Sequence, residues 1–103
     1  MGAVCPLGLQ LAPIWKALVE GRRVRHEISL FETAGCRCSF GALVALPEIT
    51  KAERRLSRAS RLALRAAEEA LEQAQVYGSA RRDIHISVST NGGAMEWGEA
   101  FVR

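Results

Sequence analysis

The chain has 103 residues, of which 49% are hydrophobic and 24% charged, and this composition is ordinary for a single globular domain. It excludes a disordered chain, a collagen and a coiled coil as descriptions of the whole sequence. Fourteen Lys and Arg residues against eleven Asp and Glu residues give a net charge of +3, which permits an anionic partner without requiring one. The three cysteines follow no recognisable secretory segment, so we expect reduced thiols and a cytoplasmic protein.

The first third of the sequence predicts a loop, a short helix and a surface connection. Residues 2–8 are rich in Gly and Pro and indicate a tight loop. Pro13 suits the first position of a helix and Gly21 suits its end, so we predict a helix of about two turns between them. Residues 22–33 are charged and irregular, as in a surface connection. The prolines in the long uncharged stretch at the start of the chain argue against a membrane span.

Apolar residues alternate over residues 36–46, which predicts a strand that Pro47 ends. Cys36 and Cys38 fall on the same face of this strand, where they would act as small hydrophobic side chains. A zinc site needs about four ligands at loop spacings, and both histidines lie in other segments. We therefore expect no metal site at these cysteines.

The second half of the sequence predicts a long helix followed by a strand. Thr50 and Glu53 have the spacing of a capping box, and alanines recur after them at spacings of three and four, so we predict a helix over residues 51–76. Its alanine-rich face would let another backbone layer approach closely. Alternation over residues 84–90 predicts a second strand, and residues 94–103 the start of a helix. Strands separated by a long helix imply a crossover, and hence an α/β fold with a parallel sheet.

One side of the predicted long helix carries a row of basic residues, which we call the arginine stripe. Its members are Arg54, Arg58, Arg61 and Arg65. One interpretation is a solvated face with Arg–Glu pairs worth about 0.3 kcal/mol each. The other is a docking surface for an acidic protein. Nucleic acid is disfavoured, because the stripe continues into glutamates and has no interleaved aromatic residues.

No complete catalytic constellation emerges from the residue pattern. Cys5, in a loop before a helix, is the only thiol in a position that could stabilise a thiolate. Gly92-Gly93 follows a predicted strand but lacks the rest of a nucleotide-binding motif. The acidic pair Glu68-Glu69 is explained by solvation of the helix surface. We predict neither a cofactor nor a metal.

Taken together, these segments resemble the amino-terminal part of β-ketoacyl synthases, the condensing enzymes of fatty-acid and polyketide synthesis. Residues 2–8, Gly-Ala-Val-Cys-Pro-Leu-Gly, look like the family's opening G-[AM]-V-[TS]-P-L-G. Residues 14–22 resemble its F-W-x-x-L…G-x-S helix, and residues 31–33 are similar to its F-D-[TS] stretch. Residues 55–71 match its R-x-[LM]-[SD]-R-x-[ST]-x-x-A…A-x-x-E-A-L helix, so the resemblance follows the family's order along nearly the whole chain.

The resemblance implies a thiolase-like α-β-α sandwich with mostly parallel strands, of which residues 1–103 would be a single partial domain without its first strand and catalytic portion. It also implies a parent acyltransferase activity, the decarboxylative condensation of acyl and malonyl thioesters. The family's nucleophile lies in a T-A-C-[SA] motif, with two histidines further on, and neither motif occurs in this sequence. No catalytic role is therefore inherited by Cys5, Cys36, Cys38, His26 or His85.

Three functions remain open at this stage. The first is a scaffold segment of a condensing enzyme that is inactive alone. The second is an interaction module that binds acyl carrier protein or a synthase subunit through the arginine stripe, and the third is a free-standing enzyme that uses Cys5. For the first, unpaired strand edges and exposed apolar helix faces predict homo- or hetero-oligomers. We expect neither nucleic acid nor membrane as a partner.

Overall fold

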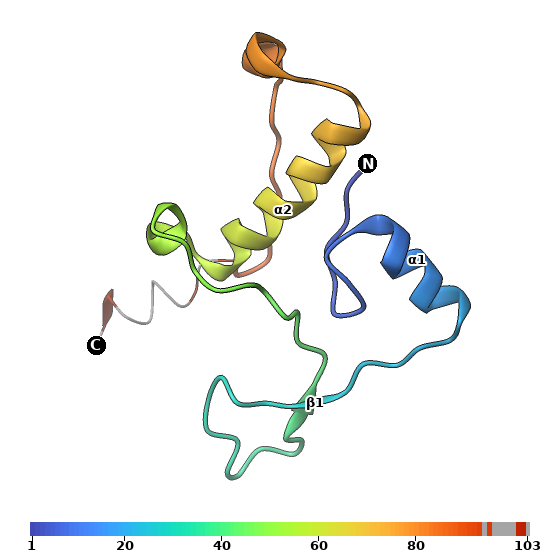
Figure 1. The fold of residues 1–103 in the computed structure, drawn as a ribbon. Helices are drawn as coiled ribbons and strands as arrows, with labels where there is room; N and C mark the ends of the chain where they lie inside the picture. The colour runs from blue at the N-terminus through green and yellow to red at the C-terminus, as the bar shows by residue number, and fades with distance from the viewer. Residues whose placement is uncertain (94, 96–100, 103) are drawn as a thin grey trace.

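The structure, a computed structural model, describes residues 1–93, 95, 101 and 102 (Figure 1). An amino-terminal loop, residues 2–8, precedes the first helix. The elements in chain order are α1 (Leu11–Val19), β1 (His26–Glu27), β2 (Phe40–Gly41), the 3-10 turn η1 (Ala52–Arg55), α2 (Arg58–Gln73) and the 3-10 turn η2 (Gly78–Asp83). The predicted helix start at residues 94–103 lies mostly outside the described residues.

Helix α1 has the predicted length and the predicted end. Its buried residues, Ile14 and Ala17, are three positions apart and lie on one face. The helix stops because Gly21 adopts a φ of +65° and donates its N–H to a carbonyl of the last turn at 3.0 Å. The helix begins two residues before the predicted start, so Pro13 is its third residue and not its first, and the missing N–H of Pro13 still costs no helical hydrogen bond. The prediction of a short helix ended by glycine is confirmed.

The predicted long helix is divided into two pieces. The Thr50–Glu53 capping box is present, since the Glu53 N–H donates to Thr50 Oγ1 at 3.3 Å and the Thr50 N–H donates to the Glu53 carboxylate at 3.1 Å. It begins only the short turn η1, because Leu56 is extended. Ser57 then starts α2 as a second N-cap, accepting the Ser60 N–H at 3.1 Å. A single continuous helix was therefore the wrong prediction for this segment.

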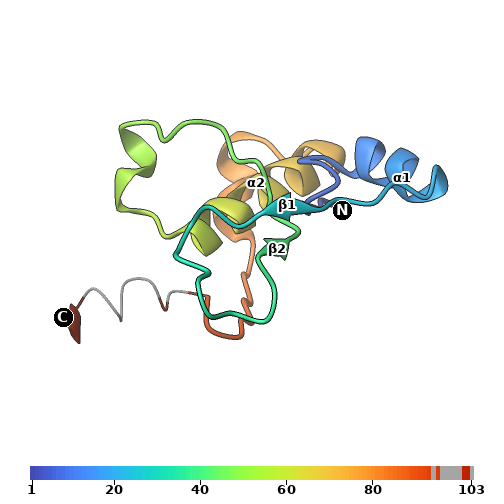
Figure 2. The same ribbon diagram turned by 90° about the horizontal axis from the view of Figure 1, so that it is seen from below.

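The expected thiolase-like sandwich with mostly parallel strands is not formed. The described sheet has two strands, β1 and β2, which are antiparallel with His26 opposite Gly41 (Figure 2). The predicted strand over residues 36–46 is reduced to its two residues in β2, and residues 84–90 form no strand. The alternating pattern marks residues able to pair, but a strand forms only where a neighbour completes its hydrogen-bonded ladder. Neighbouring strands of one hairpin pair antiparallel, so no crossover arises.

The described part of the chain has a very small core. Its buried hydrophobic residues are Ile14 and Ala17, and its buried polar residues are Ser57 and Arg61. The radius of gyration is 16.3 Å, whereas a compact domain of this length has about 13 Å. Large apolar side chains lie exposed on several elements, among them Trp15, Leu18, Val19, Leu30, Phe31, Ile49, Ile86 and Val88. None of the described helices combines the length and the apolar run that crossing a bilayer requires.

Candidate functional site

The candidate site is the junction where the amino-terminal loop lies against α2. A Cβ atom added to Gly2 would overlap the carbonyl oxygen of Ala66 and would lie 2.9 Å from the backbone nitrogen of Ala70. The two backbones therefore touch at a distance that only glycine permits. The loop is closed by reciprocal hydrogen bonds of 3.0 Å between the backbones of Cys5 and Gly8. The predicted tight loop and the predicted close approach to the alanine face are both observed at this junction.

Glu69 fastens the junction with two hydrogen bonds. One carboxylate oxygen accepts the Ala3 N–H at 3.0 Å, and the other accepts the Leu11 N–H at 2.7 Å. Leu11 is the first residue of α1, whose N-cap residue Gln10 provides no side-chain hydrogen bond. A carboxylate from α2 thus satisfies a free N–H at the start of α1 and lies at the positive end of that helix dipole.

This role of Glu69 was missed in the sequence, where the pair Glu68-Glu69 was explained by solvation. That explanation fits Glu68, whose side chain is 58% exposed and lies 3.9 Å from Arg65. Glu69 is only half-buried, but both of its oxygens have backbone partners. The sequence at the start of α1 did contain a sign of this contact. The first turn of the helix has no acidic residue and Gln10 is a poor N-cap, so a backbone N–H there has no local acceptor. A helix start without a local acceptor needs one from elsewhere in the fold.

The arginine stripe is used largely inside the molecule. Arg58 Nη2 donates to the carbonyl oxygen of Val44 at 2.6 Å, and Arg61 Nη2 donates to that of Pro47 at 2.7 Å. Arg61 is only 7% exposed. These two bonds hold the connection between β2 and η1 against α2 and satisfy carbonyls that have no strand partner.

A small charged cluster continues this row. Arg65 lies 3.5 Å from a Glu53 carboxylate oxygen and 3.9 Å from Glu68, and Arg61 Nε lies 4.0 Å from Glu53. Hydrogen bonds from the Thr50 side chain and backbone, together with these two guanidinium groups, lower the pKa of the Glu53 carboxyl. The cluster therefore fixes η1 against α2 through an ionised Glu53.

Of the four predicted contact residues, Arg58, Arg61 and Arg65 lie together on α2. Arg54 is separate from them, exposed in the turn η1. The pair of Arg65 with Glu68 is of the kind that the solvated-face interpretation predicts, whereas neither interpretation predicted that Arg58 and Arg61 would donate to backbone carbonyls. Binding of a carrier protein by these residues stays a prediction.

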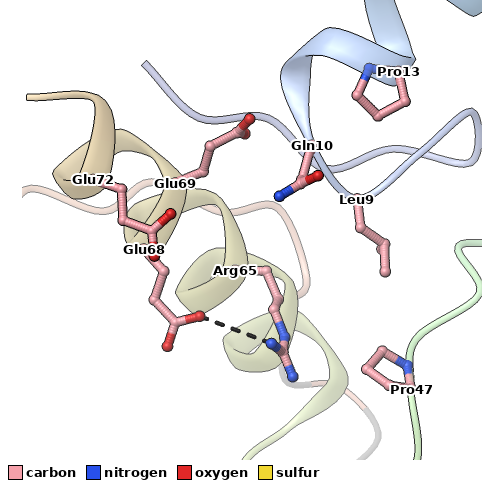
Figure 3. Close-up of a pocket in the computed structure, with 8 residues that line it drawn as sticks. All are labelled: Leu9, Gln10, Pro13, Pro47, Arg65, Glu68, Glu69 and Glu72. Carbon is pink, nitrogen blue, oxygen red and sulfur yellow. Dashed lines mark ion pairs between the residues drawn. The ribbon is translucent and has the colours of Figure 1, made fainter.

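A cavity of about 380 Å³ opens beside the junction (Figure 3). Helix α2 contributes the charged residues of the lining. The start of α1 and the two residues before it form one wall, and the connection between β2 and η1 contributes Pro47. The lining residues are Leu9, Gln10, Pro13, Pro47, Arg65, Glu68, Glu69 and Glu72. This lining contains no thiol, imidazole or hydroxyl group, so its ionisable groups are one guanidinium and three carboxylates. Of these residues, Glu69 already accepts two backbone N–H groups.

The thiols and imidazoles do not form a constellation. Cys5 lies in the amino-terminal loop, Cys36 and Cys38 are exposed in the connection between the strands, His26 is in β1 and His85 is exposed after η2. The prediction that the two neighbouring cysteines belong to a strand is wrong, because the strand begins only after them. Among the described residues, no three His, Cys, Asp or Glu side chains are grouped to hold a metal ion.

Searches of protein-family models, of curated proteins and of solved structures find no match for this chain. The resemblance to β-ketoacyl synthases is therefore carried by the sequence motifs alone. It stays a prediction.

Proposed function

We propose that this chain is a scaffold segment of an acyl-condensing protein of the β-ketoacyl synthase class. It contributes helices and a loop to a larger assembly and carries out no chemistry by itself. The reaction of that assembly is the decarboxylative condensation of acyl and malonyl thioesters, and the cytoplasm is its compartment. A synthase subunit or an acyl carrier protein is the expected class of partner.

The observation that carries this proposal is the contact between two motif segments that are far apart in the sequence. The amino-terminal loop matches one family motif and α2 matches another. They meet where Glu69 accepts the Ala3 N–H at 3.0 Å and where Gly2 lies against the backbone of α2. The glycine that opens the first motif is needed for this contact, since a side chain would overlap Ala66. Two motifs that pack together support a common origin for both.

The exposed apolar surface supports the need for further polypeptide. On α1 the side chains of Trp15, Leu18 and Val19 are 67%, 56% and 71% exposed. Burial stabilises apolar surface by about 25 cal/mol per Å². A helix with this much uncovered apolar area gains substantially when another surface covers it, as expected for a scaffold within an assembly.

The separation of the reactive groups supports a non-catalytic role. Within the described chain no cysteine is hydrogen-bonded to a histidine. The Cys38 thiol instead donates to the carbonyl oxygen of Phe40, and its sulfur accepts the Phe40 N–H. Nucleophilic catalysis by a thiol requires a base or a cation beside it. The reacting groups would therefore come from other parts of the assembly.

A complementation experiment tests the proposal. The matching amino-terminal segment is deleted from a β-ketoacyl synthase, and this chain is co-expressed with the remainder. We expect no condensation of acyl and malonyl thioesters by either part alone and measurable condensation by the pair.

Two glycine variants make the test specific for the junction. Gly2→Ala places a Cβ into the backbone of α2 and should abolish complementation. Gly41→Ala is the matched control, because its Cβ would meet Ile28 at an ordinary contact distance of 3.4 Å. Turnover by this chain alone, failure of the pair, or equal activity of the two variants would each overturn the proposal.

A further inference from the structure

Residues 84–90 form an extended, exposed segment that leaves η2 without joining a sheet (Figure 1). In the part of the chain that the structure describes, none of its backbone N–H and C=O groups makes a backbone hydrogen bond. The side chains of Ile86 and Val88 are 82% and 74% exposed. The segment therefore presents both unpaired backbone and uncovered apolar surface.

The residue pattern of this segment is that of a strand with one apolar face. Ile84, Ile86 and Val88 alternate with His85 and two serines, and Thr90 follows. Four of the seven residues are β-branched, none is glycine or proline, and His85 is the only ionisable one. Such a segment favours pairing, because β-branched side chains pack well on a pleated surface and unpaired strand groups recruit a partner.

We propose that residues 84–90 pair with the same residues of a second copy of this chain, as an antiparallel ribbon centred on Ser87. In this register Ile86 lies opposite Val88 of the other copy, and His85 lies opposite Ser89. Ser87 lies opposite its own counterpart. Every apolar residue then faces a β-branched residue, Ile84 lying opposite Thr90, and the histidine and both serines face polar residues.

The antiparallel arrangement follows from the position of the histidine. A parallel, in-register pair would set His85 directly opposite His85, two ionisable groups of the same kind on neighbouring strands. The antiparallel pair separates them and is related by a two-fold axis, so both copies make the same contacts.

A second copy fits this segment better than the sheet within the chain. Strands β1 and β2 have two residues each, too few to pair with seven. The alternation of residues 84–90 is instead self-complementary when one copy is reversed. This inference is independent of the acyl-condensing function, because it uses only the pairing capacity of the segment.

Cysteine cross-linking tests both the partner and the register. In a background with Cys5, Cys36 and Cys38 replaced by serine, Ser87→Cys should form a disulfide-linked dimer on mild oxidation, because the opposed Cα atoms of an antiparallel pair lie within disulfide range. His85→Cys should cross-link far less, since it faces Ser89. Equal cross-linking at both positions would overturn the antiparallel register.

Charge substitution tests the pairing without cysteines. Ile86→Lys with Val88→Lys sets lysine opposite lysine in the ribbon and should abolish association, read from the mass in light scattering across a concentration series. Leu30→Lys with Ile49→Lys is the matched control, because these residues are 61% and 59% exposed and lie outside the segment. A two-stranded ribbon alone is marginal in water, so the series must reach sub-millimolar protein. A wild-type monomer throughout, or equal association of the two double variants, would overturn the proposal.

Discussion

Replacing Glu69 by glutamine should release the amino-terminal loop from α2. The carboxylate accepts the Ala3 N–H at 3.0 Å and the Leu11 N–H at 2.7 Å. Glutamine keeps one oxygen for one of these donors but turns an NH₂ group toward the other. Two N–H donors then face each other, and one of them loses its partner.

The expected cost follows from the two bonds. A hydrogen bond to a charged group contributes about 1.5–3 kcal/mol, and a neutral one contributes about 1 kcal/mol. Glu69→Gln removes one charged bond and weakens the other, while water can reach a half-buried N–H and recover part of the loss. We expect a net cost of about 2 kcal/mol, which corresponds to about 30-fold in the equilibrium between docked and undocked loop.

Amide hydrogen exchange measures this change at the two donors. We expect the amides of Ala3 and Leu11 to exchange about 30-fold faster in Glu69→Gln than in the wild type. Glu68→Gln is the matched control on the same helix, because its side chain is 58% exposed and its ion pair with Arg65 is 3.9 Å long. Exposed pairs contribute about 0.5 kcal/mol, so the control should shift exchange little. Equal exchange at Ala3 and Leu11 in the two variants would refute the role assigned to Glu69.

Two further predictions concern the row that holds η1 and the connection on α2. Arg61→Ala leaves the Pro47 carbonyl without its 2.7 Å donor, so it should lower the free energy of unfolding, measured by urea titration, by about 2 kcal/mol. Arg54 is exposed, so Arg54→Ala should change this free energy by less than about 0.5 kcal/mol. Similar urea midpoints for the two variants would contradict the prediction. The pKa of Glu53 lies below its ordinary value of 4.5, so ionised Glu53 stabilises the folded state above pH 4.5. This contribution to the free energy of unfolding is lost as the pH falls from 4.5 through the lowered pKa. Thr50→Val removes the largest cause and should move the NMR titration of Glu53 back toward 4.5; an unchanged titration would exclude Thr50 as the cause.

The features that the sequence predicted well are those that depend on local backbone chemistry. Gly21 ends α1 because it alone tolerates the positive φ without strain, and the capping box at Thr50 forms between residues three apart. The alanine face of α2 was predicted from spacing, and it receives the backbone at Gly2. Each of these signals needs no knowledge of the rest of the fold.

The features that could not be predicted depend on partners distant in the sequence. Alternation marks residues 36–46 and 84–90 as capable of pairing, but it does not say which strand lies beside them. Likewise, the residues next to Glu69 in the sequence do not indicate that its carboxylate oxygens accept the N–H groups of Ala3 and Leu11. The continuous helix failed for a local reason that could have been seen, since Ser57 is a second cap signal within the predicted span.

Polar side chains, rather than apolar packing, determine how the described segments are arranged. Glu69 fixes the loop and α1 on one side of α2, while Arg61 fixes the connection through Pro47, and each acts on backbone groups. Such bonds are directional, so they set the position of a segment, but their net contribution is only about 1–3 kcal/mol each. Apolar burial supplies most of the stability of a domain, and here Ile14 and Ala17 supply little of it. In this chain the polar bonds already set the positions of the segments, while most of the apolar surface is still uncovered. A partner surface that covers these apolar faces should therefore raise the stability of the chain without rearranging α1 and α2.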